Sequence, residues 1–266
     1  DFVACHNPSY VTKCKMVEDL KKGGIFLLNC SWDAAQLDEH LPGSMKRYIA
    51  QNDIQFYTID ATHIAKELGL GGRVNTILQA AFFKLSGIIP EEKAVQLMKD
   101  AATRSYGKKG EKIVAMNHAA IERGVAGTVK VEIPASWANA EDTVVETEVN
   151  TDRPELKKFV KEILEPASAQ LGDQLPVSAF KDTADGTFPQ GSAAFEKRGI
   201  AVDTPCWIPE NCIQCNFCSY VCPHAVIRPF ALTEEEAKNA PEGMKMKPMT
   251  GVPGMQFSVA ISALDF

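Results

Sequence analysis

The chain has 266 residues, of which 45% are hydrophobic and 23% are charged, proportions typical of a globular protein with one or two domains. Its formal net charge of −6 argues against a nucleic-acid binder, which would carry a basic stripe, and a mildly acidic surface suits no anionic membrane. We find no stretch of about eighteen apolar residues, so we expect no transmembrane helix.

The N-terminal sequence Asp-Phe-Val-Ala-Cys-His lacks the basic and apolar regions of a signal peptide. It has no starting methionine and opens within an expected strand, which indicates a fragment of a longer protein. Of the eight cysteines, five lie between residues 206 and 222, and Cys5, Cys14 and Cys30 are scattered. Clustered metal-type spacing with loose single cysteines indicates a reducing cytoplasm rather than a disulfide scaffold, and we expect Cys5 and Cys30 to be small buried hydrophobic residues.

The first sixty residues alternate between apolar runs typical of buried strands and segments with helical spacing. We expect strands at residues 2–5, 25–28 and 54–59, and helices at 8–22 and 31–51, the latter broken at Pro42-Gly43. The helix at 8–22 rests on apolar residues spaced by three, from Val11 to Leu20. The alternation predicts right-handed crossovers and a parallel sheet.

After Asp60 the pattern becomes helical. Helices are expected at residues 61–68, 73–85, 90–105 and 111–123. Gly69-Leu70-Gly71-Gly72-Arg73 does not match a nucleotide-binding fingerprint and follows a helix, so we interpret it as a helix C-cap.

Polar residues follow the three expected strands: His6-Asn7, Asn29 and Asp60. Ligands of doubly wound sheets bind beyond the carboxyl ends of the strands, so these residues are candidates for a substrate or coenzyme cleft. Asn and Asp are also the usual turn and cap residues, and we favour that second interpretation.

The composition changes after Val125. A half-buried strand is expected at 129–134, and residues 140–152 hold five acids and no basic residue, as in a solvated linker. We therefore divide the chain into residues 1–150, 151–205 and 206–266. The middle part combines a helix over 151–168, interrupted near Pro166, with a loop-rich stretch.

The main chemical signal is the run Cys212, Cys215, Cys218 and Cys222, spaced C-x2-C-x2-C-x3-C and followed by Pro223. This is the spacing with which bacterial-type ferredoxins hold 4Fe–4S clusters. Structural zinc sites usually come as two separated pairs, so zinc and a disulfide knot are the weaker alternatives.

The fourth cysteine of such a run ligates the other cluster in two-cluster ferredoxins. Cys212, Cys215 and Cys218 are therefore expected to share one cluster, and Cys222 to reach a second. No cysteine follows Cys222, so either the remaining ligands lie beyond Phe266 or Cys206 completes a single cluster.

We expect packing roles for the apolar residues around the run. Ile213, Val221 and Ile227 are candidates for an apolar wall beside the cluster, and for Phe217 and Tyr220 we favour packing. The segment from Ala231 to Gly254 resembles an insertion over the domain surface that guards a cluster or shapes a partner dock. We favour a plain solvated loop for it.

A second motif precedes the run: Phe195-Glu196-Lys197-Arg198-Gly199-Ile200-Ala201. By itself it indicates a charged, solvated turn. It resembles the "EKR" segment of pyruvate:ferredoxin (flavodoxin) oxidoreductases, which lies just ahead of a two-cluster ferredoxin domain. Further stretches resemble the gamma-type domain of that family, at residues 4–7, 24–29, 57–61 and 134–138.

The resemblance implies a multidomain thiamine-diphosphate and Mg²⁺ enzyme. Such an enzyme oxidatively decarboxylates pyruvate with coenzyme A to acetyl-CoA and carbon dioxide. Its electrons pass through 4Fe–4S clusters to ferredoxin or flavodoxin. This chain lacks the pyruvate- and thiamine-binding domains, so its residues are expected to conduct electrons and position coenzyme A, without a catalytic residue of their own.

The expected fold is α/β: a partial doubly wound parallel sheet with added helices, then a small loop-rich segment and a partial α+β ferredoxin-like domain. The remaining domains of the parent enzyme, itself a homodimer, are the expected partners, with no nucleic acid and no membrane. The alternative function is a non-catalytic iron–sulfur electron-carrier subunit of a split 2-oxoacid oxidoreductase.

Overall fold

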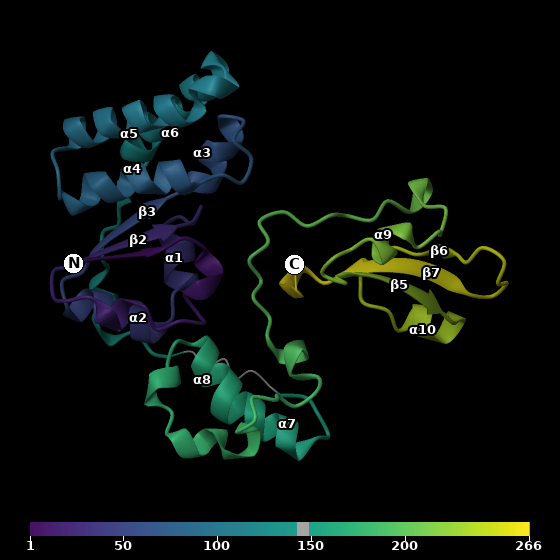
Figure 1. The fold of residues 1–266 in the computed structure, drawn as a ribbon. Coiled ribbons are helices and arrows are strands. Elements are labelled where there is room, and N and C mark those ends of the chain that lie inside the picture. Colours follow the sequence, from purple (N-terminus) through teal and green to yellow (C-terminus); the bar gives the residue numbers. More distant parts are fainter. Residues whose placement is uncertain (143–148, 266) are drawn as a thin grey trace. The chain divides into compact units, whose positions relative to one another are not determined.

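A computed structural model describes residues 1–142 and 149–265 of the chain. The chain forms two compact units, Asp1–Gly186 and Thr187–Phe266 (Figure 1). The finer division at residues 150 and 205 stays a prediction, and the acidic run at 140–152 lies partly outside the described residues.

The first unit contains a four-stranded sheet. Its strands are β1 (Phe2–Cys5), β2 (Ile25–Asn29), β3 (Gln55–Ile59) and β4 (Val129–Lys130). β1, β2 and β3 are parallel neighbours in that order, and β4 pairs antiparallel with β3. The predicted parallel α/β arrangement is therefore confirmed.

Helices cover both faces of this sheet (Figure 1). They are α1 (Ala34–His40), α2 (Gly43–Gln51), α3 (Ala61–Glu67), α4 (Asn75–Ser86), α5 (Glu91–Tyr106) and α6 (Glu111–Ala126). Side chains of β2 alternate between two cores: Phe26 and Leu28 pack with α1 and α2, and Leu27 packs with α3 and α4. Burial on both faces explains why this strand is a continuous apolar run.

The segment at residues 8–22 corrects a prediction. In place of one α-helix it contains two 3₁₀ turns, Pro8–Tyr10 and Val17–Asp19. A spacing of three residues is the period of the 3₁₀ helix and drifts off one face of a 3.6-residue α-helix. Val11, Val17 and Leu20 are nevertheless buried, as their apolar character requires.

The helical stretch after residue 153 is interrupted, as expected, ahead of Pro166. α7 (Pro154–Phe159) runs through a π-helical turn, Val160–Leu164, into α8 (Glu165–Ser168). Proline has no N–H to give to the carbonyl four residues earlier, and its ring crowds that carbonyl. The wider turn relieves this conflict, so the chain is distorted and not broken.

The expected C-cap after α3 is confirmed, since Leu70 donates its N–H to the Ala65 carbonyl and Gly69 has φ +72°. The strand expected at 129–134 shortens to the two residues of β4. Among the described residues, no helix is long and apolar enough to cross a membrane.

The second unit contains an antiparallel sheet in the order β5–β7–β6. Its elements are α9 (Phe217–Tyr220), β5 (Ile227–Leu232), α10 (Glu234–Lys238), β6 (Lys247–Pro248) and β7 (Gln256–Ile261). The segment 231–254 is therefore more than the solvated loop we favoured, because it supplies α10, with a capping box at Thr233, and β6 of the sheet.

Candidate metal centre

The four cysteines of the run lie on one short stretch of the second unit. Cys212 caps the 3₁₀ turn Pro209–Asn211, Cys215 lies in the loop that follows, and Cys218 lies in α9. Cys212 and Cys222 are half-buried, and Cys215 and Cys218 are exposed; all four are free thiols. The loop therefore presents soft sulfur ligands at the surface of this unit.

The backbone on both sides of Cys215 is left-handed, with φ +59° at Gln214 and +58° at Asn216. This conformation costs an L-residue other than glycine roughly 1–2 kcal/mol, less for Asn. Such residues persist where the surroundings fix them and cluster at functional sites. Cys215 therefore lies at the tip of a loop whose shape the fold specifies.

Backbone N–H groups approach two of the sulfurs. The Gln214 N–H lies 3.4 Å, nitrogen to sulfur, from Sγ of Cys212. Donors at Val226 first, and then at Ile227, His224 and Ala225, lower the pKa of the Cys222 thiol below its usual value. The thiolate is the form that binds metal, so these donors favour the ligating state.

The single cysteines of the first unit behave in the opposite way. Cys5 and Cys30 are buried, and burial raises the pKa of each thiol to about 11. A neutral buried thiol is a poor metal ligand and a good small hydrophobic side chain. The expectation for these two residues is confirmed.

The donor chemistry of the run fits an iron–sulfur cluster: four thiols at ferredoxin spacing, with N–H groups directed at sulfur. Among the described residues, no three His, Cys, Asp or Glu side chains are already gathered as a metal-binding group. The assignment of these four thiols as cluster ligands therefore stays a prediction.

Cys206, the alternative fourth ligand, is exposed, and its sulfur lies 3.8 Å from Nζ of Lys245. Whether Cys206 completes a cluster stays a hypothesis.

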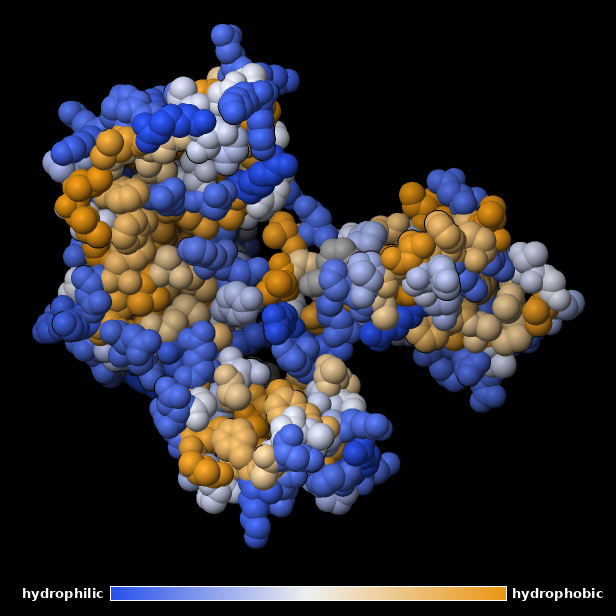
Figure 2. Space-filling model, viewed as in Figure 1, coloured by the Kyte–Doolittle hydropathy of each residue, from blue (hydrophilic) through white to orange (hydrophobic). Residues whose placement is uncertain are grey.

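The apolar side chains beside the cysteines correct a further expectation. Ile213, Phe217, Tyr220 and Val221 are exposed, Tyr220 at 87%. Packing roles were predicted for them, and within the described residues nothing buries them. Figure 2 shows apolar surface on this unit among the charged side chains. Contiguous exposed apolar groups mark contact surfaces in soluble proteins.

The Glu-Lys-Arg triplet divides into two contacts. Nη2 of Arg198 lies 2.7 Å from Oε1 of Glu196, a local pair at the surface. Lys197 instead reaches Asp265, the end of the 3₁₀ turn after β7, and the Gly199 N–H donates to the Leu264 carbonyl. The solvated turn indicated by the sequence is thus wrong for Lys197, which is half-buried.

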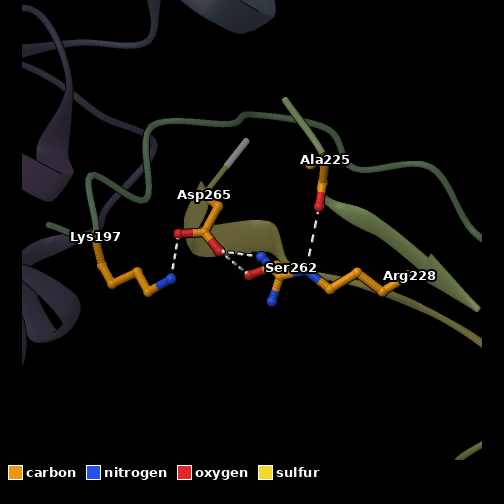
Figure 3. Close-up of polar contacts among 5 residues, drawn as sticks. All are labelled: Lys197, Ala225, Arg228, Ser262 and Asp265. Atoms are coloured by element: carbon orange, nitrogen blue, oxygen red, sulfur yellow. Dashed lines mark hydrogen bonds and ion pairs between the residues drawn. The ribbon is translucent and has the colours of Figure 1, made fainter. Parts of the chain in front are cut away.

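Asp265 collects three side chains (Figure 3). Besides Lys197, Nη2 of Arg228 lies 3.1 Å from Oδ2, and the Ser262 hydroxyl donates to the same oxygen at 2.6 Å. Lys197 first, and Ser262 next, hold the pKa of this carboxyl below its usual value. The contacts tie the motif loop, β5 and the end of β7 to one carboxylate.

The polar residues at the carboxyl ends of the parallel strands are engaged locally. Asn29 donates to the His6 carbonyl at 2.9 Å and accepts from the Ala61 N–H at 2.9 Å. Oδ1 of Asp60 accepts from the His63 N–H, and Oδ1 of Asn7 accepts from the Ser9 N–H. The turn and cap interpretation is confirmed for Asn7 and Asp60. Asn29 instead links the residue after β1 to the first residue of α3.

A groove of about 350 Å³ lies between α4 and α5, lined mainly by apolar side chains such as Phe83, Leu97 and Met98. Tyr106 is the titratable residue in its lining. The groove therefore brings together no acid–base pair.

Two residues that contact the candidate site or the Glu-Lys-Arg loop were missed from the sequence. Lys247 donates to backbone carbonyls at the start of the cysteine run, and Asp265 anchors the Glu-Lys-Arg loop. Both lie more than thirty residues from their partners, as the sequence numbering shows, and no local pattern connects them.

Known proteins resemble this chain along its whole length. Residues 1–127 match the family described as pyruvate ferredoxin/flavodoxin oxidoreductase, and residues 143–201 match EKR, described as a domain of unknown function. The pyruvate-flavodoxin oxidoreductase of Enterobacter agglomerans is 50% identical over 265 residues, covering 100% of this chain and 22% of that protein.

Two further relatives have the same coverage of this chain. The pyruvate:ferredoxin oxidoreductase of Moorella thermoacetica is 48% identical over 100% of this chain and 22% of its own length. The mitochondrial pyruvate dehydrogenase (NADP⁺) of Euglena gracilis is 42% identical over 100% of this chain and 14% of its own length. The chain thus spans about a fifth or less of the curated relatives it matches. Its residues 1–127 match the pyruvate ferredoxin/flavodoxin oxidoreductase family, and the chain aligns with one segment of these longer proteins.

Proposed function

We propose that this chain is the gamma-type and electron-conducting part of an enzyme that oxidatively decarboxylates pyruvate with coenzyme A. The products are acetyl-CoA and carbon dioxide, with two electrons and one proton released. Thiamine diphosphate with Mg²⁺, held elsewhere in the parent enzyme, supplies the carbon chemistry. The matched family and the names of the relatives support this assignment.

The role proposed for the chain's own residues is to bind clusters and set their surroundings. Cys212, Cys215 and Cys218 would hold one 4Fe–4S cluster and Cys222 a second, each cluster supplying one-electron chemistry when bound. The observation that carries this proposal is the cysteine loop itself. Left-handed residues flank Cys215, and a backbone N–H is directed at the sulfur of Cys212.

Iron content tests the cluster assignment. In the intact protein purified without oxygen, we expect iron and sulfide in cluster proportion and broad visible absorption. Cys215→Ala should lose one cluster's iron and loosen the second unit, because metal binding is coupled to folding there. Cys14→Ala, outside the run, is the control. Zinc by elemental analysis, or unchanged iron in Cys215→Ala, would contradict the proposal.

Cys206→Ala separates the two ways of completing the ligand set. If Cys206 completes a single cluster, this variant should lose iron as Cys215→Ala does. If the remaining ligands lie elsewhere on the polypeptide, its iron content should match the wild type. Neither result changes the assignment of the four cysteines of the run. The iron content shows whether Cys206 or a residue elsewhere on the polypeptide is the fourth ligand of the cluster held by Cys212, Cys215 and Cys218.

The acceptor and the setting are further proposals. We assign ferredoxin or flavodoxin as acceptor, a cytoplasmic location and a homodimeric parent enzyme. Because a relative named for NADP⁺ shares this segment, the segment does not by itself select the acceptor. To identify the acceptor, the intact protein is supplied with pyruvate and coenzyme A, and the rates at which it reduces ferredoxin, flavodoxin and NADP⁺ are compared. If none of the three acceptors is reduced even when pyruvate and coenzyme A are both supplied, the electron-carrier alternative is favoured.

Coenzyme A positioning by the first unit rests on the family resemblance. Asn29 and Asp60, which follow β2 and β3 and which sequence reasoning singled out, already make hydrogen bonds within the first unit. Isothermal titration calorimetry of the intact protein with coenzyme A, with pyruvate withheld, tests whether coenzyme A binds.

A further inference from the structure

The segment between β5 and β7 lies against the first half of the cysteine run. Its strand β6 joins the sheet as the partner of β7, with Lys247 opposite Phe257 and Pro248 opposite Gln256. This pairing fixes the direction in which the residues of β6 face the rest of the unit. The pairing of β6 with β7 therefore fixes the backbone position from which the residues of β6 contact the cysteine loop.

Lys247 reaches the loop with its ammonium group. Nζ donates to the Pro209 carbonyl at 2.9 Å and to the Cys212 carbonyl at 2.8 Å, and the side chain is half-buried. These two carbonyls belong to the residues at the two ends of one turn, since the Cys212 N–H itself donates to the Pro209 oxygen. Hydrogen bonds from a charged donor are stronger than neutral ones, so Lys247 fixes the peptide of a predicted ligand.

Gln214 makes the reciprocal contact from the loop to the segment. Nε2 donates to the Pro248 carbonyl at 2.7 Å, and Oε1 accepts from the Thr250 N–H at 2.7 Å. The same residue is left-handed, with φ +59°, and its own N–H is directed at Sγ of Cys212. The paired amide thus holds Gln214 in a conformation that the residue would otherwise avoid.

We propose that Lys247 is a positioning residue for the Cys212 end of the cluster site, with Gln214 as its counterpart on the loop. Together they preset the stretch from Pro209 to Cys215, and the Lys247 charge favours the reduced state of a cluster held there. Reduction adds negative charge, and a nearby cation stabilises it. This inference rests on the proposed iron–sulfur function.

The test uses the intact protein, prepared without oxygen, with Lys247→Met, Lys247→Arg and Gln214→Ala. Lys238→Met is the matched control, because Lys238 is an exposed lysine of the same segment, at the end of α10. We expect Lys247→Met and Gln214→Ala to lose iron to a chelator about 10- to 100-fold faster than the wild type, the usual size of an outer-shell effect. Lys247→Met should also titrate at a more negative potential, and Lys247→Arg should recover both properties in large part.

Wild-type iron retention and potential in Lys247→Met would overturn the inference while leaving the proposed function intact. A wild type without iron would instead refute the proposed function. If Lys247→Met binds no iron, hydrogen exchange of the metal-free wild type and variant is compared to separate a positioning role from a loss of folding. Faster exchange confined to residues 209–215 and 247–250 supports positioning, and faster exchange throughout the second unit contradicts it.

Discussion

Asp265 shows how single residues organise the second unit. Its side chain is 16% exposed and contacts Lys197 and Arg228, whereas the pair of Lys22 and Asp53 in the first unit is 72% and 68% exposed. Exposed pairs contribute little, because water screens them and ordering long side chains costs entropy. A substitution that removes one of the Asp265 contacts should therefore lower stability measurably.

Lys197→Met should lower the stability of the second unit at neutral pH, whereas Lys22→Met should leave the first unit unchanged. The folded protein holds the pKa of Asp265 below its usual value, so its contribution to stability is present above the unfolded pKa, about 3.9. It is lost as the pH falls through the lower, folded pKa. The difference in unfolding temperature between Lys197→Met and wild type should accordingly shrink below about pH 4.

Asp265→Asn provides the second arm of a double-mutant cycle with Lys197→Met. If Lys197 and Asp265 stabilise the fold through their contact with each other, the double variant should unfold at no lower a temperature than the less stable of the two single variants. Additive losses measured by thermal unfolding would contradict direct coupling, because independent sites add.

At the scale of elements, α4 and α6 pack through a glycine. A Cβ at Gly124 would lie 2.4 Å from the Ile77 carbonyl oxygen and 3.0 Å from Cβ of Ala80. Both contacts belong to α4, whose inward face carries Ile77, Ala80 and Ala81 at 0% exposure. Small residues on both helices allow this close approach, and the backbone oxygen cannot move away as a side chain could.

For Gly124→Ala, overpacking should cost about 1–3 kcal/mol, and the roughly 1 kcal/mol that alanine gains over glycine in a helix offsets part of that cost. The net effect expected is a destabilisation of the first unit by up to about 2 kcal/mol. Hydrogen exchange of the α4 and α6 amides measures it. Gly107→Ala is the control, since Gly107 has helical φ and open space around its Cα, and it should be neutral or slightly stabilising. Equal protection in both variants would contradict the packing argument.

At the scale of the molecule, the two units differ in how much apolar surface they bury. The cores of the first unit hold most of the buried hydrophobic residues, whereas the described part of the second unit buries Val226 and Phe257. A unit with so small a core needs a further constraint such as a metal. The proposed clusters would provide it.

Removing iron with a chelator should therefore destabilise Thr187–Phe266 and leave Asp1–Gly186 folded. Limited proteolysis of the intact protein before and after chelation, read by mass spectrometry, measures this. New cleavage sites should fall in the second unit. Equal sensitivity of both units would contradict a cluster-dependent fold.

The sequence determined much of the first unit and the identity of the candidate ligands. Apolar runs predicted β1, β2 and β3, and helical spacing predicted α3, α4, α5 and α6 near their observed bounds. The cysteine spacing predicts Cys212, Cys215, Cys218 and Cys222 as donors, because ligands of one short loop are neighbours in sequence. These are local patterns, and local patterns are readable along a single chain.

The tertiary structure decided what depends on contacts between distant residues. The two 3₁₀ turns at Pro8–Tyr10 and Val17–Asp19, the exposure of Phe217 and Tyr220, and the docking of β6 all followed from which elements cover which surface. Lys247 on Cys212 and Lys197 on Asp265 join residues separated by 35 and 68 positions. Chain folding, and not sequence spacing, brings such groups together, because the free energy of a contact depends on spatial distance.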